Sequence, residues 1–354
     1  MHMADALISP AIGGAMWAVA GGAIAVSARK MRQSLDSARV PMMGVMGAFV
    51  FAAQMVNFPI PGTGSSGHLG GGLLLAVMLG PWAAFVTIAS ILAVQALLFA
   101  DGGLLALGCN IVNMGLLPCF IAYPLIYRPL AGPKPTGSRI ALASVVAATV
   151  GLAIGATGVA VQTTASGITE LPVGKFLLLM VPIHLAIGLV EGLVTAAVVT
   201  FVWRARPEAL ELARPDSASA GRLVPVAACL LVAAGVVGGL VSWFASGDPD
   251  GLEWSVARTS GVEELAGPEG GVHAALQGVQ ERTSLLPDYD FPPGEANEPT
   301  TTDAGPADAE SAGLCAPSAG TSVSGLVGGG ATLLIALSAG WLLRRKQQVA
   351  GDRQ

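Results

Sequence analysis

Long uncharged apolar runs, separated by short polar or glycine- and proline-rich breaks, set the pattern of this chain. Several runs extend to about 18 residues or more, and a helix needs about 20 apolar residues to cross the hydrocarbon core of a bilayer. Because lipid offers the backbone no hydrogen-bond partners, such runs must be helical, and they are too long for the alternating strands of a membrane barrel. The pattern predicts an all-α polytopic membrane protein.

The breaks between the runs predict nine crossings of the membrane. Breaks at Gly80-Pro81 and Asp101-Gly102-Gly103 interrupt helices, so residues 58–128 divide into three helices, the first of them short. We expect a seven-helix bundle at 1–205, a linker at 206–222, a two-helix unit at 223–346 and a tail at 347–354. The other spans are expected at residues 10–28, 41–57, 140–161, 176–203, 223–245 and 324–343.

The charged residues predict the orientation of these spans. Apolar residues make up 53% of the chain and charged residues only 12%, against about 25% charged residues in an ordinary soluble domain, and the mean hydropathy is +0.66. Most of the 18 lysines and arginines lie in four segments, at 29–39, 128–139, 204–222 and 344–353. The positive-inside rule makes these segments cytoplasmic. A multi-pass protein of the inner or plasma membrane follows, with its N-terminus outside and its C-terminus in the cytoplasm.

The segment at 246–323 has a different composition from the rest. Acidic residues far outnumber basic ones in it, and its later part is rich in proline, alanine, glycine, serine and threonine. This composition predicts a flexible acidic loop on the outer face, with His273 solvated. The loop either gathers cations electrostatically or, above all at 295–323, is only a solvated tether.

The motifs that would indicate other functions are either absent from the sequence or lie in the wrong structural surroundings. Gly62, Gly64 and Gly67 spell G-x-G-x-x-G, but no strand–helix–strand unit surrounds them and no phosphate-loop lysine follows. The sequence also contains neither a Walker motif nor the H-E-x-x-H of metallopeptidases. The chain therefore does not hydrolyse ATP itself, and nothing in it indicates an enzyme or a nucleic-acid partner.

Two of the four histidines are expected to meet at the outer face. His68 lies in the glycine-rich stretch "NFPIPGTGSSGHLGGG" at 57–72. A polar stretch of this kind is tolerated at membrane depth only where it is buried in protein or lines a cavity, so the loop is expected to fold inward. The predicted topology places His2 on the same face.

The N-terminus itself carries metal-binding chemistry. The α-amine of Met1, the peptide nitrogen of His2 and the Nδ1 atom of His2 can close consecutive chelate rings around one ion. A fourth nitrogen from His68 completes a square-planar site, the geometry that Ni(II) and Cu(II) favour. The alternative is that His2 is simply a disordered terminal residue.

Three segments resemble one known family. "MHMADALISP", "FAAQMVNFPIPGTGSSGHLGG" and "LLFADGGLLALGCNIVNMG" are similar to the substrate-binding S component of nickel and cobalt energy-coupling-factor (ECF) transporters, the CbiM/NikM family, over residues 1 to about 205. The resemblance implies a helix bundle whose N-terminal segment inserts into the protein and whose ion is held by Met1, His2 and His68. Asp5, where many relatives have glutamate, is then a supporting partner of the site.

The C-terminal unit carries a second resemblance. "GDPDGLEWS" at 247–255, "LLPDYDFP" at 285–292 and the final span resemble the accessory component called CbiN or NikN, the PDGLE family, here fused to the S component. Residues 248–251 also read as a turn followed by a short amphipathic segment. The resemblance implies a role in opening or loading the metal site.

Other polar residues are expected to support the site. His184 and Glu191 lie seven residues apart in "VPIHLAIGLVEGLV", on one face of a helix, and ionisable residues inside a membrane are functional by default. We expect an internal hydrogen-bonded pair or part of a coupling interface, with direct metal contact as the weaker alternative. Gln54 and Asn57 either support the ligand loop or satisfy backbone groups freed by nearby prolines.

The resemblance implies the function and the partners. The chain would bind Ni²⁺ or Co²⁺ as its cargo, with no permanent cofactor, and act with an ECF transmembrane coupling (T) subunit and paired ATPase (A) subunits in the lipid bilayer. Nickel is favoured, because four nitrogens suit planar Ni(II) and the Irving–Williams order places Ni(II) above Co(II). Two alternatives are a proton-linked secondary carrier that uses Asp101 and Glu191, and a membrane metalloenzyme built on the same nitrogens.

Overall fold

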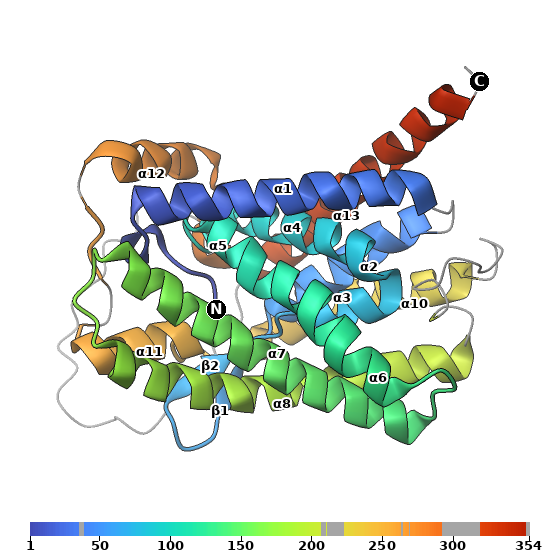
Figure 1. The fold of residues 1–354 in the computed structure, drawn as a ribbon, viewed down its shortest axis with the longest axis horizontal. Coiled ribbons are helices and arrows are strands. Elements are labelled where there is room, and N and C mark those ends of the chain that lie inside the picture. Colours follow the sequence, from blue (N-terminus) through green and yellow to red (C-terminus); the bar gives the residue numbers. More distant parts are fainter. Residues whose placement is uncertain are drawn as a thin grey trace.

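The computed structural model describes residues 1–34, 39–206, 210, 223–262, 265–268, 270–291 and 319–351 (Figure 1). Its described part is an all-α bundle with the predicted division into seven helices and two, and six of the helices are long and apolar enough to cross a membrane. The predicted linker lies largely outside the described residues, whereas residues 347–351 of the predicted tail continue α13. The bundle contains α1 (Pro10–Ser34), α2 (Arg39–Gln54), α3 (Gly72–Leu79), α4 (Pro81–Leu98), α5 (Leu107–Ile111), α6 (Arg128–Ala131), α7 (Gly137–Ser166), α8 (Val173–Ala205), α10 (Val224–Gly239) and α13 (Ala319–Gly351).

The expected breaks lie where glycine and proline interrupt the pattern. α3 is short and wholly buried, and Gly80 separates it from α4 with φ 80°, a conformation that favours glycine. Pro81 is the first residue of α4, a position where its missing N–H costs nothing. α5 and α6 are the two ends of one helix, Leu107–Ala131, whose middle is formed of wide π-helical turns.

A short hairpin follows α2, and the apolar pattern does not predict it. β1 (Phe58–Ile60) pairs antiparallel with β2 (Ser65–Gly67). The turn between them contains Gly62 and Gly64, both with positive φ, so the glycine motif serves a turn. β2 is fully buried and leads directly to His68, which confirms that the loop folds into the protein.

α7 and α8 pack closely because α8 has glycines at the contact. A Cβ atom on Gly188 would lie 2.6 Å from the Cα atom of Thr149, and one on Gly192 would lie 2.5 Å from the Cα atom of Val145. Small residues allow membrane helices to approach in this way. The approach of α7 and α8, the two green helices of Figure 1, places the buried residues His184 and Glu191 beside the hairpin.

The accessory unit is more ordered than its composition predicts. α10 and α13 pack against α2, and two helices, α11 (Gly251–Ser260) and α12 (Gly271–Thr283), lie within the segment expected to be a flexible loop. That expectation is wrong for these residues, because Asp250 caps α11 and Leu252 and Val256 are buried. Residues 292–318, which include most of the expected tether, lie outside the described part.

Candidate metal-binding site

The N-terminal segment enters the interior, as expected. The N-terminus lies among α5, α7 and the hairpin in Figure 1, and Met1 and Met3 are both buried. The backbone of Met3 donates to the Oδ1 atom of Asn110 at 2.8 Å and accepts from the backbone N–H of Gly103 at 2.9 Å. These bonds fix the path of the first residues between α5 and the loop that precedes it.

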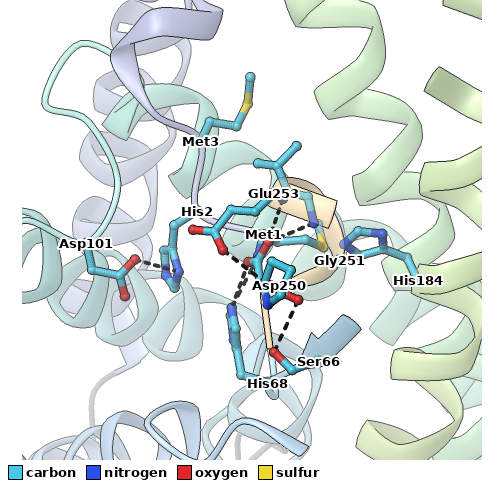
Figure 2. Close-up of polar contacts among 12 residues, drawn as sticks. Met1, His2, Met3, Ser66, His68, Asp101, His184, Asp250, Gly251 and Glu253 are labelled. Carbon is cyan, nitrogen blue, oxygen red and sulfur yellow. Dashed lines mark hydrogen bonds and ion pairs between the residues drawn. The ribbon is translucent and has the colours of Figure 1, made fainter. Parts of the chain in front are cut away.

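The α-amine of Met1 meets the imidazole of His68. Met1 N lies 3.2 Å from the Nε2 atom of His68, and both residues are buried (Figure 2). The other ring nitrogen, Nδ1, lies 3.1 Å from the carbonyl oxygen of Leu69. With the Nδ1 proton donated to that carbonyl, the Nε2 lone pair faces the amine and is available as a ligand.

His2 completes the cluster, but its Nδ1 atom points away from the amine. Its ring stacks on that of His68 with 5.0 Å between ring centroids, and its Nδ1 atom lies 3.1 Å from Asp101 Oδ1. The Nε2 atom is buried and has no hydrogen-bond partner in the described part of the chain. The predicted chelate therefore requires the imidazole to turn away from Asp101.

Burial and charge determine the protonation of two groups outside the spans. Burial lowers the pKa of His2 to about 4, although Asp101 raises it, so the imidazole is neutral near pH 7. Burial alone would raise the pKa of Asp250, but the ammonium of Met1 and the neighbouring imidazole of His68 hold it well below its usual range. A neutral imidazole and an ionised carboxylate are the states in which these groups bind metals.

Asp250 is the site residue that sequence reasoning missed. Its Oδ2 atom lies 2.6 Å from the α-amine of Met1 and 3.7 Å from the Nε2 atom of His68. The sequence contains one signal for this residue: Asp250 and Glu253 have the D-x-x-E spacing of a capping box, which the structure forms. That signal predicts the start of a helix, not a contact with the N-terminus.

Glu191 and Gln54 both hold the loop that carries His68. The carboxylate of Glu191 accepts from the backbone N–H groups of Gly70, at 2.7 Å, and Gly71, at 3.2 Å. Gln54 donates to the carbonyl oxygen of Gly70 at 2.9 Å, which agrees with its expected supporting position. Gly71 has φ 75° and lies against Val50, so no larger side chain fits there.

The remaining predicted polar residues contact the backbone of other residues. His184 lies 2.7 Å from the carbonyl oxygen of Met180, and Glu191 binds the ligand loop, so the expected His184–Glu191 pair is wrong. Asp5 accepts from the backbone N–H of Ala106 at 2.9 Å and so fixes the loop before α5. The backbone carbonyl oxygen of Asn57 accepts from the backbone N–H of Ser246 at 2.8 Å.

His273 is also placed differently from the prediction. It is buried, and its Nε2 atom lies 2.9 Å from the carbonyl oxygen of Ile8, so the expectation of a solvated residue is wrong. The imidazole links α12 to the backbone just before α1. A composition average over a long acidic segment does not detect a contact of this kind.

A small cavity lies beside these groups. It has about 10 Å³ of space, and its lining includes Met1, His68, His184 and Asp250. A space of roughly 10–15 Å³ holds one water molecule, so a hydrated ion does not fit without movement of the protein. No cluster of three or more His, Cys, Asp or Glu side chains has metal-binding geometry in the described residues, so the candidate site depends on the α-amine.

Comparison with known proteins identifies the family. The CbiM family, described as the cobalt uptake substrate-specific transmembrane region, matches residues 2–209. The chain belongs to the CbiM family. A PDGLE domain matches residues 225–345, so the CbiM region and a CbiN-like unit occur in one chain, as the sequence predicts.

Relatives with the same two parts extend over most of the chain. The fused nickel transport protein NikMN of Rhodobacter capsulatus is 30% identical and aligns with 82% of this chain and 88% of its own length. A relative from Archaeoglobus fulgidus that also carries the NikMN name is 32% identical, and the match covers 99% of this chain and 100% of the relative. The cobalt transport protein CbiM of Sorangium cellulosum is 32% identical over 60% of this chain and 95% of that protein.

A solved structure agrees with the fold. The crystal structure of a truncated transition metal transporter superposes with a TM-score of 0.51 and 33% identity, over 58% of this chain and 99% of that one. Together with the helices long enough to span a membrane, these matches make this CbiM protein a multi-pass membrane component of nickel or cobalt transport. It is a transporter and not an enzyme.

Proposed function

We propose that this chain is the substrate-binding membrane subunit of an ECF transporter that imports Ni²⁺ or Co²⁺. The ion is held by the α-amine of Met1, the amide and imidazole of His2, and the imidazole of His68. The observation that supports this proposal most is the buried approach of Met1 N to His68 Nε2, at 3.2 Å, with the ring of His2 stacked beside it. The buried α-amine thus lies within reach of the imidazole of His68, and a metal ion can bind both nitrogens once the amine is deprotonated.

Nickel is the favoured cargo. Four nitrogens that include an ionised peptide amide suit planar Ni(II), and the Irving–Williams order places Ni(II) above Co(II). Copper would bind such a set more tightly still, so selection against it also depends on availability and access. The NikMN relatives carry nickel in their names, and the family description carries cobalt.

The energy for import comes from other subunits. We propose that the chain acts with an ECF T subunit and a pair of A subunits that hydrolyse ATP, since its sequence contains no Walker motif. We also propose that the site opens toward the outer face of the membrane, because the basic segments predict a cytoplasmic C-terminus and an external N-terminus.

The test of this function adds Gly-Ser-Gly before Met1 in the full chain. The extension displaces the α-amine and separates it from His2, so we expect Ni²⁺ and Co²⁺ binding, measured by titration calorimetry on the purified protein, to be lost. His68→Ala should also lose most of the affinity. The control carries the same three residues after Gln354 and should bind like the unmodified chain. Equal binding by the N-terminally extended chain would contradict the proposal.

The proton-linked carrier has less support from the site. Asp101 contacts His2, Glu191 holds two loop amides, and both carboxylates are thus engaged in positioning the ligand segments. Uptake that continues without ATPase subunits and collapses when an uncoupler is added would favour that alternative. Turnover of a substrate at the same nitrogens would favour a metalloenzyme.

A further inference from the structure

The two carboxylate oxygens of Asp250 contact different groups. The Oδ1 atom accepts from the backbone N–H groups of Leu252, at 2.7 Å, and Glu253, at 2.9 Å, and so caps α11. The Oδ2 atom takes no part in the cap and faces the α-amine of Met1 at 2.6 Å. The cap thus aims one oxygen of an accessory-unit carboxylate at the candidate site (Figure 2).

The position of this oxygen matches that of a metal ligand. Met1 N, His68 Nε2 and Asp250 Oδ2 form a triangle with edges of 2.6, 3.2 and 3.7 Å. Two ligands bound at adjacent positions of one first-row metal ion lie about 3 Å apart, because each metal–ligand bond is about 2.1 Å long. Once the ammonium of Met1 releases a proton to water, the three atoms can therefore converge on one ion after small shifts.

The backbone holds Asp250 in register with the ligand hairpin. The N–H of Ser66 donates to the carbonyl oxygen of Pro249 at 2.8 Å, and the hydroxyl of Ser66 donates to that of Asp248 at 2.7 Å. Trp254 donates from its indole to the carbonyl oxygen of Thr63 at 3.0 Å. Because Ser66 lies two residues before His68, this pairing fixes the carboxylate and the imidazole relative to each other.

His2, in contrast, is not turned toward the ion position. Its Nδ1 atom faces Asp101, which also accepts a 2.5 Å hydrogen bond from the hydroxyl of Tyr289. An arriving ion therefore meets Met1, His68 and Asp250 before the imidazole of His2 has turned. A carboxylate oxygen suits this step, because a hydrated divalent ion already has oxygen ligands and exchanges one oxygen for another.

We propose that Asp250 Oδ2 is a loading ligand: it binds the incoming Ni²⁺ or Co²⁺ together with the Met1 amine and His68, and gives way when His2 turns in. This inference rests on the proposed function of the nitrogen site and adds to it a ligand from the accessory unit. It gives the fusion of the two units a chemical reason, since the PDGLE segment supplies an oxygen that the CbiM region lacks at this point.

The test measures how fast the full purified chain takes up Ni²⁺ when mixed rapidly with NiCl₂. Asp250→Asn and Asp250→Ser both lose the carboxylate and keep a side chain that caps a helix well. We expect both to load on the order of tenfold more slowly, within the range over which association rates change in variants of one site. Asp248→Asn, which removes a carboxylate two residues away, is the matched control and should load at the unmodified rate.

Loading of both Asp250 variants at the unmodified rate or faster would overturn the proposal, because the carboxylate would then only pair with the amine. An equal slowing by Asp248→Asn would also overturn it, since any negative charge would then suffice. The unmodified chain gives an independent readout: nickel X-ray absorption of samples frozen early in loading should show mixed nitrogen and oxygen ligands that become nitrogen-rich. A nitrogen-only shell at every time would overturn the proposal.

The same experiment separates this inference from the function on which it rests. If the unmodified chain takes up no Ni²⁺, or His68→Ala takes it up normally, the proposed nitrogen site fails. If the unmodified chain loads, His68→Ala does not, and the Asp250 variants load normally, only the loading role of Asp250 fails.

Discussion

At the scale of single residues, Glu191 shows how a buried carboxylate can have a positioning task. Its two oxygens accept from consecutive backbone amides, those of Gly70 and Gly71, just after His68. Gln54 holds the carbonyl oxygen of Gly70 from the other side. The polypeptide that carries the histidine is thus fixed by side chains of α8 and α2, which hold the imidazole in place.

Substitution of Glu191 should therefore weaken metal binding without removing a ligand. Glu191→Ala leaves two buried amides without an acceptor, at about 1–3 kcal/mol each, and we expect the Ni²⁺ affinity to fall roughly 10- to 100-fold, as for partners that orient ligands. Glu191→Gln keeps one acceptor oxygen and should lose less. Calorimetric titration measures both affinities.

The same pair of variants distinguishes positioning from proton transfer. If Glu191 carried a proton for a secondary carrier, Glu191→Gln would abolish uptake as completely as Glu191→Ala does. A Glu191→Ala chain with the affinity of the unmodified chain would contradict the positioning role.

The sequence predicts the site residues whose chemistry is local, and it does not predict those that reach the site through long-range contacts. Met1, His2 and His68 could be proposed because their chemistry is local and the resemblance names their positions. Asp250 contacts Met1, and Tyr289 contacts Asp101, from far along the chain, and residue spacing does not predict such contacts. His184 and Glu191 do share a buried helix face, but Glu191 binds the backbone of the loop that carries His68, and His184 binds the backbone of Met180 in its own helix.

At the scale of elements, the helices follow from the apolar pattern because lipid allows a spanning segment no other structure. The outer segments obey no such rule, and there the prediction failed except for the short amphipathic segment after residues 248–251, which is α11. β1 and β2 have only three residues each, too few for a period of two to be visible. α11 and α12 lie in a segment whose average composition is polar, although the cap at Asp250 and the buried Leu252 are local helix signals.

The contact between α7 and α8 gives a prediction at this scale. A methyl group on Gly188 would meet the backbone of Thr149, which cannot move away as the end of a side chain can. Gly188→Ala should therefore destabilise the bundle by about 1–3 kcal/mol, as overpacking does, and lower its melting temperature in detergent. Gly21→Ala is the matched control, because nothing lies within 4 Å of its new methyl group among the described residues. If the Gly188→Ala chain has the same melting temperature as the control, the two helices are free to separate enough to accommodate the methyl group.

At the scale of the whole molecule, the accessory unit encloses the N-terminal segment from several sides. Asp250 pairs with the amine of Met1, His273 binds the backbone of Ile8, and Tyr289 holds Asp101 beside His2. The first two contacts join the PDGLE region to the segment that carries Met1 and His2, and the third joins it to the carboxylate that faces His2. Because the cavity beside the amine has room for about one water molecule, loading requires that part of this enclosure move.

A disulfide between the two regions should prevent that movement. A Cβ atom built on Gly267 lies 3.7 Å from the Cβ atom of Ala6, within the roughly 3.5–4.5 Å that a disulfide spans. We expect the chain with Ala6→Cys and Gly267→Cys, once oxidised, to take up Ni²⁺ at least about tenfold more slowly, and to recover when the bond is reduced. Each single cysteine variant, treated with the same oxidant, controls for the native thiols. If the oxidised double variant loads as fast as its reduced form, the ion reaches its ligands by a route that leaves the contact between residues 6 and 267 closed, and the accessory unit would then act on the site only through its side chains.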